Sequence, residues 1–247
     1  LAVFGYDKTN TILTQTLEKE GACISFVDSV SSLPQQINNK ESTLVVYTPA
    51  IPIGNEILRW FVENNYWVMK RSQFLGELTQ DTLCLAVAGT HGKTTTSAIL
   101  GHVLAYCNMP VTAFLGGITE NYKSNFISKG TEITVVEADE FDRSFLTLKP
   151  DIACITSMDA DHLDIYGDVT AIEESFVEFA NLVPNKKQLL HKKGLPLAGQ
   201  SVAIAETADY EAQNVRIKNG VYIFDLKTPG RILRGLEFSL PGHHNLH

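Results

Sequence analysis

The order of hydrophobic and polar positions predicts strands alternating with helices along most of the chain. Short apolar runs at residues 22–27 and 43–48 are typical of strands, and segments 9–20 and 55–64 repeat apolar positions at helical spacing. Strands and helices that alternate in this way indicate a parallel α/β sheet. A short helix predicted over 73–79 runs into a polar stretch, so we place a domain boundary after residue 79.

A second α/β unit begins at Leu83. Apolar runs predict strands at 83–89, 111–117, 132–139 and 151–157, and helical spacing predicts helices at 95–106 and 171–182. The last two of these strands are apolar throughout, as strands buried on both faces should be. Beyond Asn185 the pattern changes to short alternating stretches, and Asn219-Gly220 between two of them predicts a β-hairpin. The fold class predicted is α/β, with a parallel sheet and a small accessory β-sheet.

Composition narrows the classes of function. The chain has 247 residues, with 20 Lys+Arg against 28 Asp+Glu and a formal net charge of −8. This acidic balance argues against non-specific binding to nucleic acid or to a membrane surface. Apolar runs fall far short of the ~20 residues that span a bilayer, and no export signal opens the chain. The four cysteines are scattered without a CxxC pair, which favours reduced thiols and a cytoplasmic protein.

The most informative segment is GTHGKTT, between an apolar strand and a predicted helix. Its glycines allow backbone N–H groups to close around phosphate oxygens, and the helix N-terminus adds a favourable dipole. Lys93 can reach the β- and γ-phosphates, and the Thr94 hydroxyl can hold Mg²⁺. The loop is tighter than G-x-x-x-x-G-K-[ST], which would need glycine in place of Val87. These residues predict a nucleoside triphosphate site formed by Gly89, Thr90, His91, Gly92, Lys93, Thr94 and Thr95.

Acidic residues follow two of the apolar strands. Glu137 ends one strand, with Asp139 and Glu140 just beyond it, and the segment after the next strand carries Asp159, Asp161, His162 and Asp164. Carboxyl ends of neighbouring parallel strands meet at one edge of a sheet, where a phosphate loop needs an acidic residue for its metal. Imidazole is an unusual ligand for Mg²⁺, but its place among carboxylates favours His162 as a ligand.

Four motifs, in this order, resemble those of the Mur ligase family, the ATP-dependent amide-forming enzymes of peptidoglycan precursor synthesis: AVAGTHGKTTTS, VVEADEFDRSFLTLKPDIACIT, DADHLDIYG and LPGHHN. The resemblance covers nearly the whole chain. It implies a Rossmann-like UDP-sugar domain at 1–79, a central ATP-binding domain at 80–247 and a third, C-terminal domain. Because the third domain and the glycine-rich loop of the first are absent, we expect weak or no ligation by residues 1–247 alone.

The resemblance also implies roles for individual residues. Lys93, Glu137 and His162 would be catalytic, with one Mg²⁺ on Thr94 and Glu137 and a second on His162. Adenine would lie near His244 and Asn245. The TPAI segment, beginning at Thr48, would lie near the UDP-sugar, although this segment is usually serine-rich in the family. The muramoyl group would face Gly116, Gly117 and Asn125. Ser157 stands where Asn is common in the family.

Within the family, the motifs most resemble the branch that joins L-alanine to the lactyl carboxylate of UDP-N-acetylmuramate through an acyl-phosphate. ATP and Mg²⁺ are the cofactors implied, and Asp159 or Asp161 is our hypothesis for the base that deprotonates the amine. Three alternatives stay open. A ligase that recycles murein tripeptides shares GTHGKTTT and EADE; folylpolyglutamate synthetase shares the loop but has no preceding UDP-sugar domain; and the chain could be a nucleotide-binding module without turnover.

Overall fold

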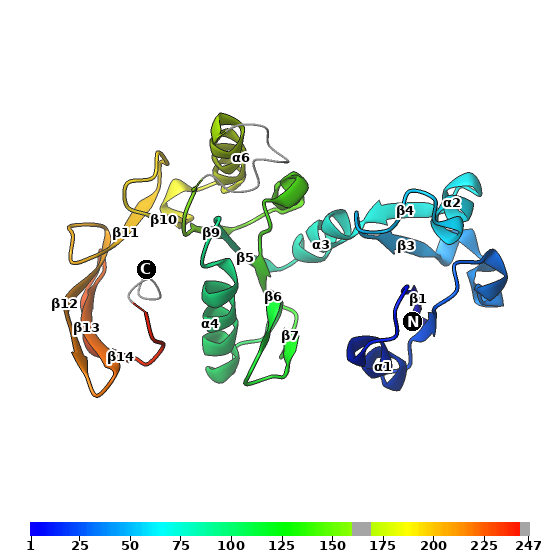
Figure 1. Ribbon diagram of the computed structural model, residues 1–247. Coiled ribbons are helices and arrows are strands. Elements are labelled where there is room, and N and C mark those ends of the chain that lie inside the picture. Colours follow the sequence, from blue (N-terminus) through cyan, green and yellow to red (C-terminus); the bar gives the residue numbers. More distant parts are fainter. Residues whose placement is uncertain (160–168, 243–247) are drawn as a thin grey trace. The chain divides into compact units, whose positions relative to one another are not determined.

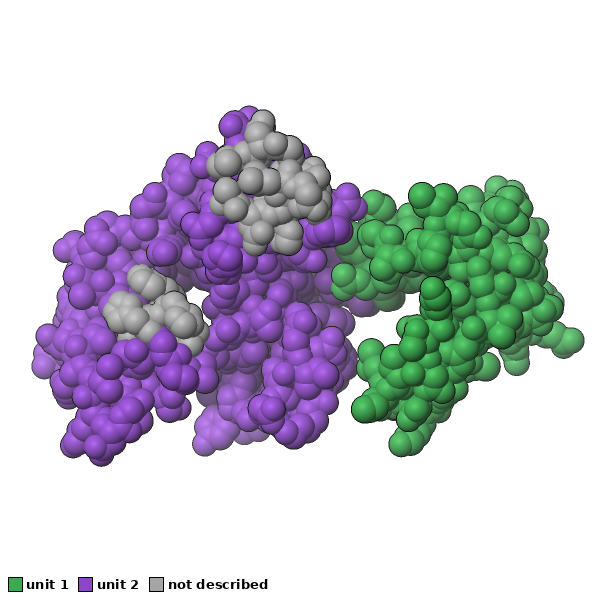
Figure 2. Space-filling model, viewed as in Figure 1, with its two compact units in different colours: residues 1–74 green, residues 75–247 purple. Residues whose placement is uncertain are grey.

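The computed structural model describes residues 1–159 and 169–242. The chain divides into two compact units, Leu1–Phe74 and Leu75–His247 (Figure 2). The division falls within helix α3 (Arg71–Thr79), whereas the sequence places the boundary at the end of that helix.

The first unit contains two short parallel sheets (Figure 1). One pairs β1 with β2 and the other pairs β3 with β4. The elements are β1 (Phe4–Tyr6), α1 (Ile12–Lys19), β2 (Cys23–Ser25), β3 (Leu44–Tyr47), α2 (Glu56–Glu63) and β4 (Trp67–Lys70). Helices α1 and α2 confirm the two predicted from apolar spacing. Strand β4 was not predicted, because it runs directly into α3 with no residue between them.

Helix α2 begins where side chains accept its first N–H groups. The Oδ1 of Asn55 accepts from the Leu58 N–H at 2.7 Å, and the Asp28 carboxylate accepts from Glu56 and Ile57, both at 3.0 Å. These bonds satisfy donors that the helix itself leaves without acceptors. The apolar side of α2 and the residues after it form the core of this unit, whose buried members are Ile57, Phe61 and Tyr66.

The second unit is built on one ten-stranded sheet in the order β14-β13-β12-β11-β10-β9-β5-β8-β6-β7. Neighbours from β12 to β6 are parallel, and the pairs at the two ends are antiparallel. The strands are β5 (Leu83–Ala88), β6 (Val111–Thr119), β7 (Ser124–Ser128), β8 (Ile133–Glu137), β9 (Ile152–Ile155), β10 (Leu189–Lys192), β11 (Gln200–Ile204), β12 (Tyr210–Lys218), β13 (Val221–Lys227) and β14 (Ile232–Phe238).

This sheet confirms the predicted α/β class but changes one detail. The strands beyond Asn185, which the sequence assigns to a small accessory sheet, continue the hydrogen-bonded order from β9 outward. The predicted hairpin is confirmed between β12 and β13, where Asn219 and Gly220 both adopt positive φ, 53° and 79°. This is the backbone that a two-residue type I′ turn requires.

Helices cover both faces of the sheet. Alternate residues of a strand point to opposite faces, and β8 accordingly places Val135 in one buried cluster and Val136 in another. Helix α4 (Lys93–Tyr106) packs on the first cluster, and α6 (Val169–Leu182) packs on the second, as Phe176 and Phe179 show. Within the described residues, no helix is both long and apolar enough to cross a membrane.

Candidate functional site

The carboxyl ends of β5, β8 and β9 meet at one edge of the sheet. Val87 of β5 lies opposite Glu137 of β8 on one side and Cys154 of β9 on the other. Directly beyond, the Thr156 N–H donates to the Ala88 carbonyl at 3.0 Å. The residues that follow these three strands are therefore neighbours, as the sequence predicts for Glu137 and for the segment that leads to Asp159.

The segment after β5 forms a tight loop that ends in a helix N-terminus. Gly89 and Gly92 have φ of 134° and 85°, a region that side chains rarely adopt. A Cβ on Gly89 would lie 2.2 Å from Thr156 Oγ1, so this position also excludes a side chain sterically. Helix α4 begins at Lys93, two residues earlier than predicted, and its first N–H groups have no acceptor within the helix. They lie at a hollow of about 300 Å³ lined by Thr90, Gly92, Lys93, Thr94, Thr95 and Glu137.

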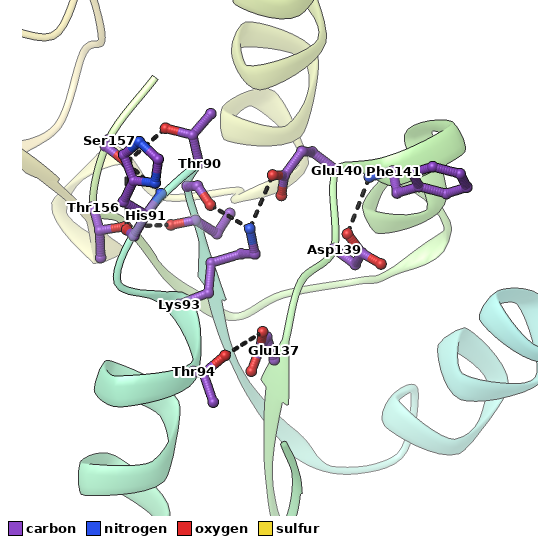
Figure 3. Close-up of polar contacts among 12 residues, drawn as sticks. Thr90, His91, Lys93, Thr94, Glu137, Asp139, Glu140, Phe141, Thr156 and Ser157 are labelled. Atoms are coloured by element: carbon purple, nitrogen blue, oxygen red, sulfur yellow. Dashed lines mark hydrogen bonds and ion pairs between the residues drawn. The ribbon is translucent and has the colours of Figure 1, made fainter. Parts of the chain in front are cut away.

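Residues after β9 hold the loop in place through hydrogen bonds (Figure 3). The buried Ser157 hydroxyl bonds the Thr90 hydroxyl at 2.8 Å and accepts from the His91 N–H, also at 2.8 Å. The Thr156 hydroxyl donates to the Ala88 carbonyl at 3.1 Å and also bonds the His91 carbonyl. Because these bonds join two strands' ends, the loop's shape is fixed before any ligand enters.

Lys93 is held from two sides in this site (Figure 3). Its Nζ donates to the Gly89 carbonyl at 2.7 Å and to Oε1 of Glu140 at 2.9 Å. The Glu140 side chain is 1% exposed and that of Lys93 13%, so this ion pair is largely shielded from water. Glu140 comes from the segment after β8, three residues beyond Glu137.

Glu137 accepts hydrogen bonds from two elements, helix α4 and strand β6. Its Oε1 accepts from the Thr94 hydroxyl at 2.8 Å, and its Oε2 accepts from the Gly116 N–H at 2.7 Å and the Ser97 hydroxyl at 3.4 Å. A carboxylate and a hydroxyl oxygen this close together, beside a phosphate loop, suit Mg²⁺, which takes few protein oxygens plus phosphate oxygens and water. The residues present therefore fit the predicted ion.

The structure places the other predicted residues as follows. His91 has an exposed ring, with Nε2 3.9 Å from Oδ2 of Asp159. Gly116 and Gly117 lie at the site, since a Cβ on Gly117 would be 3.2 Å from Thr94 Cγ2. Asn125 is exposed on β7, and Thr48 is exposed after β3 in the other unit. Five residues singled out from the sequence lie outside the described residues: Asp161, His162, Asp164, His244 and Asn245.

Among residues 1–159 and 169–242, no group of three or more His, Cys, Asp or Glu side chains could hold a metal. Sequence reasoning missed the contacts of Ser97, Thr156 and Glu140. Ser97 was predictable, because it lies three residues after Thr94 on the same helix face. The pairing of Glu140 with Lys93 depends on strand order, which the sequence does not reveal.

The site combines a buried strand, a glycine loop that leads into a helix N-terminus, a lysine over the loop and a carboxylate beside it. These features are typical of an α/β nucleotide-binding domain that binds phosphate groups. Comparison with known proteins agrees: residues 87–247 match the Mur ligase middle domain. A relative from Christiangramia forsetii, named UDP-N-acetylmuramate–L-alanine ligase, is 54% identical over 245 residues, which are 99% of this chain and 54% of that protein. The chain therefore belongs to the Mur ligase family, and it spans about half the length of the curated relatives it matches.

Solved structures share the fold. The UDP-N-acetylmuramate-alanine ligase of Thermotoga maritima matches with a TM-score of 0.80 and 24% identity, over 99% of this chain and 56% of that one. The UDP-N-acetylmuramate:L-alanyl-gamma-D-glutamyl-meso-diaminopimelate ligase of Neisseria meningitides also gives 0.80, with 22% identity over 98% and 81% of the two chains. Because the two TM-scores are equal, the fold does not distinguish between the two ligase activities that these structures are named for.

Proposed function

We propose that this chain is the UDP-sugar- and ATP-binding part of a ligase that joins L-alanine to UDP-N-acetylmuramate. The observation that carries the proposal is the loop from Gly89 to Thr95, with Lys93 and Glu137 directed to one hollow. The choice of L-alanine is supported by the 54% identical relative that bears that name. In this proposal, residues 1–79 bind the UDP-sugar, residues 80–247 bind ATP, and the reaction takes place in the cytoplasm.

The proposed reaction has two steps. A lactyl carboxylate oxygen attacks the γ-phosphorus of ATP, the bond to ADP breaks, and an acyl-phosphate forms. The amine of alanine then attacks the acyl carbon, inorganic phosphate leaves, and a base takes the amine proton. Catalysis of such steps is mostly positioning and electrostatic stabilisation. Asp159 or Asp161 remains our hypothesis for the base.

The residues divide this work between binding and charge stabilisation. Backbone N–H groups of the loop and of the first turn of α4 would donate to phosphate oxygens, and the ammonium of Lys93 would stabilise negative charge on the transferred phosphoryl group. Thr94 and Glu137 would hold one Mg²⁺ and His162 a second, with His244 and Asn245 near the adenine. When bound, Mg²⁺ neutralises phosphate charge. Gly116, Gly117 and Asn125 would face the muramoyl group, and Thr48 the UDP moiety.

Phosphate release tests the proposal. We would supply Mg·ATP and UDP-N-acetylmuramate with L-alanine or with murein tripeptide, to residues 1–247 and to the full-length product of the gene that encodes them. We expect alanine-dependent release by the full-length protein and little or none by the shorter chain. Tripeptide-dependent release would assign the recycling reaction instead. If neither amine gave release, the chain would be a nucleotide-binding module and the ligase proposal would be wrong.

A further inference from the structure

We propose that Glu140 is a positioning residue that aims the Lys93 ammonium at the transferred phosphate. This inference rests on the proposed function and adds to it a residue to which that function gives no role. An ammonium has three N–H donors. Gly89 O and Glu140 Oε1 accept two of them, at 2.7 and 2.9 Å, which leaves the third for a phosphate oxygen.

The two acceptors follow the ends of different strands. Together they restrict both the position of the Lys93 ammonium and the direction of its N–H groups. Gly89 follows β5, and Glu140 follows β8. A lysine side chain has four flexible carbon–carbon bonds, so a single acceptor would leave its nitrogen free to swing. Two acceptors in the shielded site restrict the nitrogen. A charge that is already in place lowers the activation barrier because it needs no reorganisation during the reaction.

The segment that carries Glu140 is itself anchored. Just after Glu140, Asp142 and Arg143 adopt positive φ of 52° and 54°, a backbone that non-glycine residues keep only where their surroundings hold it. The ring of Phe145 then stacks on Phe179 of α6 with centroids 4.8 Å apart. Arg143 also forms an ion pair with Glu178 on the same helix. Glu140 is thus carried by a backbone fixed to α6, as a positioning group must be.

The alternative role for Glu140 is that of a competitor, whose carboxylate keeps Lys93 away from an incoming phosphate. The two roles predict opposite results. If Glu140 aims the ammonium, its loss lowers turnover more than nucleotide affinity. If Glu140 competes, its loss tightens ATP binding, because a negative charge is removed from the site.

A direct test labels the lysine amines of residues 1–247 with an acetylating reagent and follows each lysine by mass spectrometry. To react, Lys93 must leave both acceptors and lose a proton. We expect Glu140→Ala to raise its labelling rate severalfold, and Glu140→Gln, which keeps an acceptor oxygen, to raise it much less. Glu211 is the matched control, since it is also largely buried and pairs with Lys227 at 3.5 Å. The Lys227 side chain is already 39% exposed, so Glu211→Ala should change its labelling little and leave Lys93 unchanged.

Kinetics of the full-length protein complete the test. We expect Glu140→Ala to lower kcat about 100-fold, the size of effect that an ångström of misplacement produces. The KM for ATP should change by less than about tenfold, and Glu140→Gln should recover most of the turnover. Unchanged Lys93 labelling, tighter ATP binding in Glu140→Ala, or a Gln variant as slow as the Ala variant would each overturn the positioning role. Absence of turnover in the native protein would instead refute the proposed function, while the labelling result would still stand.

Discussion

The backbone N–H of Gly116 donates a 2.7 Å hydrogen bond to Oε2 of Glu137, in a space where a Cβ on Gly116 would lie 2.3 Å from Oε1 of the same carboxylate. Strand β6 thus approaches the end of β8 as closely as a glycine allows. The same contact holds the Glu137 carboxylate beside the Thr94 hydroxyl, where both oxygens suit a metal ion. The resemblance to Mur ligases assigns Gly116 to the muramoyl group, and the structure adds this second reason for a glycine there.

Gly116→Ala should therefore displace Glu137. We expect the affinity for Mg·ATP to fall about 10- to 100-fold, as is typical when a residue that orients a metal ligand is lost. Nucleotide affinity measured in EDTA should change much less, because the carboxylate acts through the metal. Isothermal titration with and without Mg²⁺ measures both. Gly230→Ala is the control, since its Cβ would meet nothing within 4 Å. Equal loss with and without Mg²⁺ would contradict the prediction.

Thr94→Ala should weaken the expected metal site by removing the hydroxyl that lies beside Glu137. Loss of the hydroxyl removes one expected ligand, and we expect Mg²⁺-dependent ATP affinity to fall at least about tenfold, equivalent to about 1.4 kcal/mol. Thr94→Ser keeps the oxygen and should bind nearly as the native chain does. Thr112→Ala is a matched control, because that hydroxyl donates to a carbonyl, Gly130 O at 2.7 Å, at the amino-terminal end of β6, away from Glu137 at the carboxyl end of β8. A serine variant as weak as the alanine variant would show that the methyl group matters instead.

Ser157→Ala should loosen the phosphate loop. The change leaves the buried hydroxyl of Thr90 and the N–H of His91 without the oxygen that each bonds at 2.8 Å. We expect a loss of about 1–3 kcal/mol in the free energy of unfolding, together with weaker nucleotide binding. Urea denaturation and ATP titration measure the two effects. Ser175→Ala, at a fully buried serine of α6, should leave nucleotide binding unchanged. Native-like ATP affinity in Ser157→Ala would refute the bracing role.

Cys84 should react only when the second unit unfolds. Burial raises the pKa of its thiol from 9.0 to about 12, so at pH 8 the folded protein contains almost none of the reactive thiolate. We expect iodoacetamide at pH 8 to modify the exposed Cys23 and Cys107 first, and to modify Cys84 only in denaturant. Peptide mass spectrometry gives the order. Labelling of Cys84 as fast as that of Cys107 in the folded chain would contradict this.

The same shift has a consequence for stability. The unfolded chain releases the Cys84 proton near its usual pKa of 9.0, and the folded chain holds it up to about 12. The contribution of this group to stability is therefore complete below pH 9 and is lost as the pH rises through that window. Cys84→Ala should unfold with a weaker dependence on alkaline pH than the native chain. Identical dependence in the two proteins would contradict the prediction.

The sequence by itself determined the α/β class, the phosphate loop and the position of Glu137 at a strand end. These features depend on local sequence. A buried strand is visible as an apolar run, and the start of the helix is marked by the glycine of the loop before it. The carboxyl ends of neighbouring strands lie at one edge of the sheet once the strands are parallel. The Asn219-Gly220 pair also predicted the hairpin, because both residues readily adopt the positive φ that a type I′ turn requires. Strand β7 was missed because polar residues occupy three of its five positions, and β4 because no residue separates it from α3.

Only the tertiary structure decided which distant residues meet. Glu140 and Lys93 are 47 positions apart, and Ser157 and Thr90 are 67 apart. Both contacts exist because the strand order β9-β5-β8 brings three strand ends together around the loop. Strand order is set by packing of both sheet faces against α4 and α6, a global property that no short segment encodes. The sequence thus determined the chemistry of the loop, and the fold decided which side chains hold it in place.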